Sequence, residues 1–580
     1  EIWRLARTLA DRAAGSASDI LRLAIPPRMV RAEQQHLAAT RADQATVSGD
    51  TSDEAAAELA AALVAGARFA LSPRHAPQRL STGEWVGSWA MQLADLALAV
   101  YELGHSVILV APDYRDVDQL HDSLSALGHH DTVRVDARQS GSARYASFLR
   151  ARDEVPRIIL GNRSALYAPA HRLGAVLMWD DGDPLLAEPL SPYVHARDAA
   201  LVRSSLAEET GTHPIGLVFA AHARSAEVQR LVDLGYLTAV GEPPRVARII
   251  AGDAIAGAHE DTGRVPEAAA RTLREGLRTG PVLVQVASPG YAPAARCAQC
   301  RSRVRCEACA GPIAFRARHQ AACRWCGTQV RAWRCGECGG TEVLQLGAGS
   351  QRTAEQFSQQ FEGVRVILSD GEHPHARVDS RAALVVATRG AEPIAAGGYQ
   401  AVVLLDADRL LSIESLRAAE DCLRWWMNAA ALAAPDAPVI LAGGGGPLVQ
   451  AMMHGRVEAW LQAENHDRKL LRYPPAVRVA SVTGGPAEVD RALATIAELP
   501  GVDVIGPTPL DAADPAAHLV RAIVRFEYAQ GHEVAKRLRG ALVADAAGSS
   551  SRVAGRSPAR ARAQALRLRF DDRGVFDGAL

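Results

Sequence analysis

The sequence contains almost no lysine. Of its 64 basic residues only Lys469 and Lys536 are lysines, and the first 468 residues contain none. The phosphate-binding loop of many nucleotide-hydrolysing enzymes has the pattern Gly-x-x-x-x-Gly-Lys-[Ser/Thr], in which the lysine reaches the β- and γ-phosphates. A loop of that kind, complete with its lysine, is therefore excluded from this part of the chain.

Long apolar runs are also absent, and the net charge is close to zero. No run of about 18 uncharged apolar residues occurs, so we expect no membrane-spanning helix. The 580 residues carry a net charge of −1, which gives no chain-wide indication of nucleic-acid binding. Locally, however, eight arginines and two acids lie between Cys297 and Cys338, and residues 551–570 carry six arginines and no acid. Such clusters suit phosphate contacts, although an arginine-rich composition explains each cluster equally well.

Apolar runs of strand length recur along the chain with helix-like segments between most of them. Because these runs do not alternate between apolar and polar residues, they indicate parallel sheets covered on both faces. A chain of this length is too long for one core, and the runs divide into two doubly wound α/β lobes. The runs are residues 105–113, 156–164, 173–181 and 215–223, then 280–288, 363–371, 381–390, 400–408 and 437–444.

One of these runs ends abruptly in acids. The segment LGAVLMWDDGDP (173–184) places Asp180, Asp181 and Asp183 directly after an apolar stretch. A buried parallel strand that delivers carboxylates to its carboxyl-terminal edge is how many nucleotide-hydrolysing enzymes hold magnesium. The segment therefore indicates either such a site or what is left of one.

Eight of the nine cysteines form Cys-x-x-Cys pairs between the two sets of strands. Two thiolates separated by two residues reach one ion, and Zn²⁺ takes four sulfurs tetrahedrally. Four pairs therefore predict two closed, structural zinc sites. An iron–sulfur cluster is the remaining alternative, while disulfides are disfavoured because nothing indicates a secreted protein. The ninth cysteine, Cys422, is expected to be an apolar filler. The pairs are Cys297/Cys300, Cys306/Cys309, Cys323/Cys326 and Cys335/Cys338.

The cysteine segment and several shorter motifs resemble the primosomal protein N′ family of replication-restart helicases over nearly the whole chain. The segment begins with Gly-Tyr-Ala-Pro (290–293) and closes with Gly347, Gly349 and Ser350 before a helix. Further motifs follow in the family's order: GNRSALYAP (161–169), YVHARDAALVR (193–203), LLDAD (404–408), SLRAAE (415–420), RYPP (472–475) and VIGPTP (504–509).

The resemblance implies how the cysteines share two zinc ions. The sites are interleaved in the family, so the first and last pairs would hold one ion and the two middle pairs the other. The first set is Cys297, Cys300, Cys335 and Cys338, and the second is Cys306, Cys309, Cys323 and Cys326.

The resemblance also implies the division of the chain. We expect an α/β protein with two doubly wound, helicase-like lobes, an inserted two-zinc module and a smaller C-terminal α+β domain. The expected parts are the end of a fork-binding N-terminal domain (1–30), a linker and helix (31–80), lobe 1 (81–245), the start of lobe 2 (246–296), the zinc module (297–338), the rest of lobe 2 (339–450) and the C-terminal domain (451–580).

Family members are ATP-driven helicases, but this chain departs from them where the chemistry requires specific residues. The phosphate-loop position reads STGEWVGSWAMQ, with Gly83 and Gly87 but no lysine. Asp181 replaces the glutamate that would polarise the attacking water. The arginine-finger motif is replaced by DCLRWWMNAAALAAP (421–435), whose only arginine, Arg424, has the wrong spacing. Gly83, Gly87, Asp180 and Asp181 are therefore interpreted as a vestigial nucleotide site, and no catalytic residue is predicted.

An arginine finger alone contributes about 10³–10⁵ to the rate of phosphoryl transfer, so several such losses disfavour ATP and Mg²⁺ chemistry. We predict a DNA-binding replication-restart (primosome assembly) protein that recognises stalled or abandoned forks and promotes reloading of the replicative helicase without unwinding DNA itself. A weak or atypical ATP-dependent 3′–5′ helicase is the alternative. An RNA-associated zinc-ribbon protein is a more remote one.

The arginines of the cysteine segment are the expected DNA contacts. Trp325 and Trp333 lie among them and would either stack on an unpaired base or pack the zinc core. The resemblance implies forked and single-stranded DNA, replisome or primosome proteins, the replicative helicase or its loader, and single-strand-binding protein as partners. It also implies a cytoplasmic, nucleoid-associated location with no membrane contact. The candidate DNA contacts are Arg301, Arg303, Arg305, Arg331 and Arg334.

Overall fold

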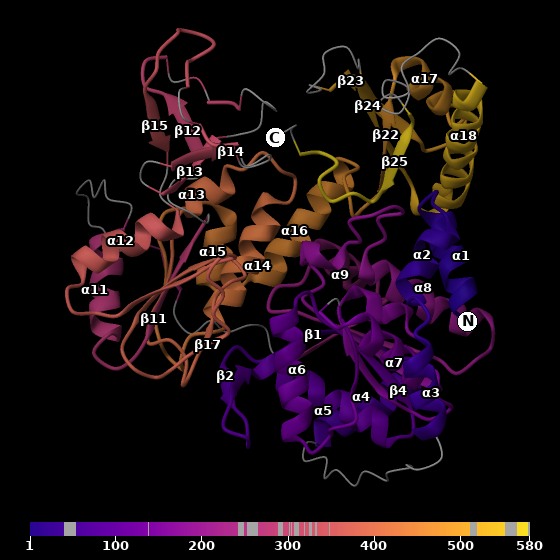
Figure 1. Cartoon of the computed structure of the whole chain (residues 1–580), viewed down its shortest axis with the longest axis horizontal. Coiled ribbons are helices and arrows are strands. Elements are labelled where there is room, and N and C mark those ends of the chain that lie inside the picture. The colour runs from indigo at the N-terminus through magenta and orange to yellow at the C-terminus, as the bar shows by residue number, and fades with distance from the viewer. Residues whose placement is uncertain are drawn as a thin grey trace.

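A computed structural model shows two parallel-sheet lobes, a small cysteine-containing module and a C-terminal domain (Figure 1). The structure describes residues 1–39, 54–136, 138–241, 249–251, 265–287, 294–300, 302, 304–306, 313–317, 320–323, 328–330, 333–346, 349–510, 519–551 and 565–577. Within these residues, no helix combines the length and the apolar character needed to cross a membrane.

Lobe 1 is built on seven parallel strands in the order β5-β6-β4-β7-β8-β1-β9. All residues of the central strand β7 are buried, which explains why its sequence is apolar without alternation. The strands are β1 (Arg68–Ser72), β4 (Ser106–Val110), β5 (Val133–Val135), β6 (Ile158–Gly161), β7 (Leu173–Trp179), β8 (Gly216–Ala220) and β9 (Thr238–Gly241).

Helices cover both faces of this sheet, and β7 supplies side chains to both cores. Val176 and Met178 join the core that contains residues of α1, α2 and α8, whereas Leu177 and Trp179 join the core that contains residues of α4, α5 and α6. Trp179 at the end of β7 therefore faces α5. The helices are α1 (Ile2–Arg12), α2 (Ala17–Ala24), α3 (Val30–Ala39), α4 (Glu54–Val64), α5 (Ser88–Glu102), α6 (Tyr114–Ala126), α7 (Gly141–Ala151), α8 (Ala196–Glu209) and α9 (Ala226–Asp233).

Lobe 2 contains six parallel strands in the order β10-β21-β20-β11-β18-β16. Residues of α14 join the core on one face of the sheet, and residues of α11 and α12 join the core on the other. The strands are β10 (Ile249–Ala251), β11 (Val282–Val286), β16 (Val366–Ser369), β18 (Leu384–Thr388), β20 (Val402–Leu404) and β21 (Val439–Leu441). The helices are α11 (Glu267–Gly276), α12 (Ser350–Gln360), α13 (Ala407–Leu411), α14 (Ala418–Ala430), α15 (Pro447–Met453) and α16 (Val457–Leu470).

The cysteine module is inserted between β11 and α12 and stands at the outer end of lobe 2 (Figure 1). Its two antiparallel pairs join β12 (Ala294–Cys297) to β15 (Val343–Leu346) and β13 (Ile313–Ala317) to β14 (Gln320–Cys323). The C-terminal domain is a four-stranded antiparallel sheet in the order β23-β24-β22-β25, with α17 and α18. Its elements are β22 (Arg478–Gly484), α17 (Pro486–Ala494), β23 (Asp503–Pro509), β24 (Val520–Phe526), α18 (Gly531–Ser551) and β25 (Arg567–Phe570).

This architecture confirms the α/β fold class expected from the sequence. Each of the nine apolar runs contains a strand, and the two lobes are separate parallel sheets. The sequence pattern missed β1, β5, β9 and β10. It also missed that α1 and α2 bury Leu5, Leu9 and Ile20 in a core of lobe 1.

Candidate functional site

A cleft of about 190 Å³ lies between the lobes at the carboxyl end of β7. Lobe 1 contributes Asp180 and Asp183, and lobe 2 contributes Arg424 and Asn428 from α14. Gly87 also lines the cleft, whereas Gly83 and Asp181 are not among its described lining residues. The four residues interpreted as a nucleotide site are therefore not gathered at one cleft.

The segment at the phosphate-loop position is a β-hairpin. Antiparallel strands β2 (Pro77–Arg79) and β3 (Trp85–Gly87) enclose a turn in which Gly83 has φ of 102°, and α5 begins immediately afterwards. The amide of Gly87 donates to Gln119 Oε1 at 2.9 Å, and the amide of Ser88 donates to the carbonyl of Ala76 at 2.9 Å. Amides at a helix start are the groups that bind phosphate, and here these two already have protein acceptors.

An aromatic stack lies over the same helix start. The ring centroids of Trp89 and Trp179 are 4.0 Å apart, and the ring planes differ by 3°. A Cβ atom added to Gly87 would lie 2.5 Å from the ring of Trp89, so the indole is packed directly against the backbone at that position. His222 contacts the edge of Trp179, with ring centroids 5.0 Å apart. These rings line the cleft beside the first residues of α5.

The acids that follow β7 are bonded to protein groups. Asp180 has φ of 50°, a left-handed conformation that Asp tolerates better than most residues. Its Oδ2 accepts from Arg424 Nη1 at 2.7 Å and from Asn428 Nδ2 at 2.9 Å. The same Arg424 nitrogen donates to Asp183 Oδ2 at 2.9 Å. One guanidinium from lobe 2 therefore pairs with two of the carboxylates that the sequence predicted as a magnesium vestige.

Asp181 bonds to lobe 1 itself. Its Oδ2 accepts from Arg197 Nη1 at 2.9 Å and from Ser225 Oγ at 2.6 Å, and the residue is buried. Burial raises the pKa of Asp181 above its usual value, while Arg197 opposes the rise. The carboxylate at the position of the water-polarising glutamate is thus engaged in a buried ion pair.

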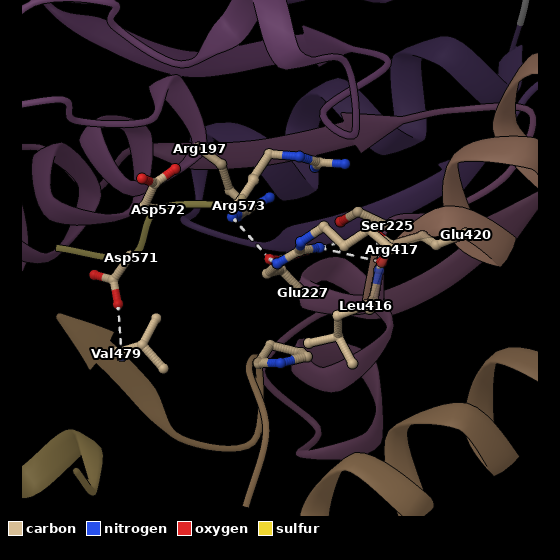
Figure 2. A network of polar contacts seen from close by, with 12 residues as sticks. Arg197, Ser225, Glu227, Leu416, Arg417, Glu420, Val479, Asp571, Asp572 and Arg573 are labelled. Atoms are coloured by element: carbon tan, nitrogen blue, oxygen red, sulfur yellow. Dashed lines mark hydrogen bonds and ion pairs between the residues drawn. The ribbon is translucent and has the colours of Figure 1, made fainter. Parts of the chain in front are cut away.

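A buried ion-pair network extends from this point across the lobes (Figure 2). Glu227 of α9 pairs with Arg197 of lobe 1 and with Arg417 of lobe 2. Arg417 also pairs with Glu420 at 3.1 Å, and Glu420 pairs with Arg468 of α16 at 3.1 Å. Burial would raise the pKa of Glu227, but the adjacent guanidinium groups, Arg417 first, hold it well below its usual value.

The titratable groups that line the cleft include more acids than cations. Within the cleft, burial and the neighbouring Asp113 raise the pKa of Asp116 well above its usual value. The titratable lining consists of the acids Asp113, Asp116, Asp118, Asp180, Asp183 and Glu392, the cations Arg115, Arg377 and Arg424, and His222.

Four cysteines of the inserted module form a separate candidate metal centre. The Sγ atoms of Cys297, Cys300, Cys335 and Cys338 all lie within 4.8 Å of one another. Two of the sulfur pairs, Cys297 with Cys338 and Cys300 with Cys335, are 3.5 Å apart. Zinc bonds to sulfur at about 2.3 Å, so a tetrahedral site has sulfurs about 3.8 Å apart. The donor set and its spacing therefore fit a four-sulfur metal site.

A neighbouring hydroxyl lowers the pKa of two thiols of this centre. Ser302 Oγ lies 3.0 Å from Cys300 Sγ and 3.3 Å from Cys335 Sγ. These hydrogen bonds lower the pKa of Cys300 and, with the backbone amide of Cys338, lower the pKa of Cys335 to about 6. The neighbouring thiols, in contrast, raise the pKa of Cys338 to about 12, so the four sulfurs are not all shifted toward the thiolate form that a metal takes.

The remaining residues of the module are only partly described. Cys306 and Cys323 are buried in its apolar core, where Trp333 also packs. Arg305 and Arg334 are exposed. The other candidates lie outside the described residues: Cys309, Cys326, Arg301, Arg303, Arg331 and Trp325.

Sequence reasoning missed the buried ion pairs that Arg197, Arg417 and Arg424 form. Arg424 was noted only as the one arginine of residues 421–435, and its partner Asp180 is 244 residues away in the chain. Arg197 lies within the motif YVHARDAALVR, and Arg417 lies within SLRAAE. The sequence offered one signal for these ion pairs, which was a charged residue within a helix segment of mostly apolar residues.

Solved structures with detectable similarity include RecG bound to a three-way DNA junction and the Escherichia coli DEAH/RHA helicase HrpB. RecG aligns with a TM-score of 0.37 at 10% identity, covering 80% of this chain and 52% of that one. HrpB aligns with a TM-score of 0.34 at 14% identity, covering 67% of this chain and 42% of that one.

Sequence relatives give a closer match. The family described as "Primosomal protein N C-terminal domain" matches residues 469–572. A Mycobacterium tuberculosis protein named probable replication restart protein PriA is 36% identical over 571 residues, covering 93% of this chain and 85% of that protein. The Mycobacterium leprae protein of the same name is 35% identical over 569 residues, with the same coverage. On this identity and coverage, the chain belongs to the PriA family of replication restart proteins.

Proposed function

We propose that this protein binds forked and single-stranded DNA at stalled or abandoned replication forks and promotes reloading of the replicative helicase without hydrolysing ATP. The observation that carries the second part of the proposal is the start of α5. There the amides of Gly87 and Ser88 already donate to Gln119 and Ala76. A phosphate would have to displace both acceptors in a segment without the lysine that attracts it.

The other catalytic positions support the same proposal. Asp180 bonds to Arg424, and Asp181 bonds to Arg197 and Ser225. A metal or an attacking water would have to replace these partners, leaving buried charges unpaired. Breaking a buried ion pair costs about 3–5 kcal/mol, which is a large share of the stability of a folded protein.

The cysteine pairs would hold two structural zinc ions. The set Cys297, Cys300, Cys335 and Cys338 has the donor type and spacing for one ion. The second ion is assigned to Cys306, Cys309, Cys323 and Cys326 on the strength of the sequence motif. Closed four-sulfur sites leave no open position for substrate, so zinc would stabilise the module rather than supply chemistry.

DNA contact is assigned to the arginine side chains of this module. The candidates are Arg301, Arg303, Arg305, Arg331 and Arg334, of which Arg305 and Arg334 are exposed in the described part of the chain. Guanidinium groups bind backbone phosphates and make affinity depend on salt. Of the domain division drawn from the sequence, this proposal uses the part that makes residues 297–338 one module. Replisome or primosome proteins and a nucleoid-associated location follow from fork binding.

The test measures binding of labelled forked DNA over a range of salt concentrations, with structured RNA as competitor. The double variant Arg305→Ala/Arg334→Ala should weaken binding and flatten the salt slope by about one unit for each phosphate that the variant no longer binds. Arg365→Ala/Arg381→Ala removes the same charge from lobe 2 and serves as the matched control, with the slope unchanged.

Two outcomes contradict the proposal. Tighter binding of structured RNA than of forked DNA would make the module an RNA-binding ribbon. Unchanged fork binding by the module variant, with its zinc retained, would move the DNA site elsewhere in the protein.

A further inference from the structure

Arg424 lies beside Asp180 and Asp183 at the carboxyl end of β7, and the carboxyl ends of parallel strands are where many nucleotide-hydrolysing enzymes hold a metal ion. Arg424 and Asn428 are four residues apart on α14, so they share one helix face. Both donate to the same oxygen of Asp180, at 2.7 Å and 2.9 Å. Arg424 also donates to Asp183 at 2.9 Å. One guanidinium therefore bridges two carboxylates, as a divalent cation would.

The surroundings are shaped for this side chain. The Arg424 side chain is 9% exposed, and the side chain of Asp180 is 5% exposed. A Cβ atom on Gly182 would lie 3.1 Å from Arg424 Cδ, so the absence of a side chain at Gly182 leaves room for the arginine. A buried guanidinium requires compensating charge, and the two aspartates provide it.

The same contact joins the two lobes. Arg424 belongs to lobe 2, and both of its acceptors belong to lobe 1. On either side of it, Arg417 of lobe 2 pairs with Glu227 of lobe 1, and Arg115 of lobe 1 donates to the carbonyl of Gly390 in lobe 2. Side chains and backbone groups of the two lobes thus contact each other directly across the interface.

We propose that Arg424 is a built-in substitute for a divalent cation. Its guanidinium holds Asp180 and Asp183, clamps lobe 2 onto lobe 1 without nucleotide, and keeps the two carboxylates from binding a metal. This inference concerns the arrangement of the lobes and a latent metal site, and it stands independently of DNA binding. Removing the guanidinium frees two carboxylates which, with water, are the ligands that Mg²⁺ and Mn²⁺ prefer.

The test uses Mn²⁺ as the probe, with binding followed by electron paramagnetic resonance of the full-length protein. Arg424→Ala should bind one additional Mn²⁺ ion per chain compared with the wild type, and adding Asp180→Asn to that variant should abolish the gain. Without metal, the melting temperature of Arg424→Ala should fall by about 5 °C or more, because a buried charge pair is broken. Mn²⁺ should restore part of that loss in Arg424→Ala and none in the double variant.

Two further variants control for charge and for folding. Arg424→Lys keeps a cation beside the aspartates and should bind no additional Mn²⁺. Arg389→Ala removes a nearby arginine that lies over the Trp425 ring, 3.8 Å from its centroid, and should likewise bind none. If Arg424→Ala does not fold, Arg424→Gln retains most of the side-chain volume and should show the same gain.

Either of two results would overturn the proposal. In the first, the wild type binds Mn²⁺ at a site that Asp180→Asn removes. In the second, the folded Arg424→Ala and Arg424→Gln variants bind no more Mn²⁺ than the wild type.

Discussion

Trp89 on the first turn of α5 stacks flat against Trp179 at the end of β7, with ring centroids 4.0 Å apart and planes 3° from parallel. Both rings belong to the apolar core between α5 and the sheet. The stack connects the start of α5, which follows the β2–β3 hairpin, with β7, the strand that Asp180 and Asp181 follow. Core packing therefore fixes the start of α5 against the end of β7.

Removing this stack should cost stability without creating a nucleotide site. For Trp89→Ala we expect a loss of about 3–5 kcal/mol in the free energy of unfolding, as for other large-to-small changes in a core. Urea unfolding measures this loss. Equilibrium dialysis at micromolar protein should still detect no ATP binding, because Gln119 continues to cap the Gly87 amide. ATP binding gained by this variant would show that the indole was the only obstacle.

The interlobe ion pairs should be among the most sensitive positions for charge removal. Arg417→Ala leaves the buried Glu227 and Glu420 without their shared partner, so we expect a loss of about 3–5 kcal/mol in the free energy of unfolding. Arg381→Ala is the matched control. Its pair with Asp379 is exposed and should contribute about 0–1 kcal/mol. Equal losses in the two variants would mean that the buried network adds nothing to stability.

The ion pairs of Glu227 should make the free energy of unfolding depend on pH in the acidic range. Its pKa in the folded protein lies well below the ordinary glutamate value of 4.5. A lowered pKa stabilises the protein above the unfolded-state pKa, and this contribution is lost as the pH falls through the folded-state pKa. The difference in unfolding free energy between wild type and Glu227→Gln should therefore shrink as the pH falls below about 4.5. A difference that stays constant from pH 7 to pH 3 would contradict the assignment.

Zinc content should follow the two predicted sets of cysteines. Elemental analysis of the purified protein should give two zinc ions per chain, and Cys297→Ser should give one. Cys422→Ser should retain both, because Cys422 is buried in a core of lobe 2, away from the module. An iron–sulfur absorption band, or a single ion in the wild type, would overturn the assignment.

The sequence pattern predicted those strands of the two parallel sheets in which every residue is buried. Runs such as β7 and β11 are apolar throughout because both faces are covered. The pattern missed β9, whose residues are mostly exposed at the sheet edge, and β5, which is only three residues long. Neither strand carries an apolar run long enough to be recognised.

The candidate site was predictable only where its residues are neighbours in the sequence. The acids after β7 and the cysteine pairs are local motifs, so their spacing in the sequence was enough to predict the kind of site. The cap of Gly87 by Gln119 and the bridge from Arg424 to Asp180 join residues 32 and 244 positions apart. Helix periodicity places such side chains on a face but does not select their partners.

ATP turnover in the presence of forked DNA tests the central claim most directly. We predict no DNA-stimulated hydrolysis above background for the wild-type protein, because the amides at the start of α5 and the carboxylates of Asp180 and Asp181 already bond to other protein groups. Turnover in the ordinary enzyme range, about 1 s⁻¹ or faster, would contradict the account if Asp180→Ala abolished it, since that variant separates the protein's own activity from a contaminating ATPase.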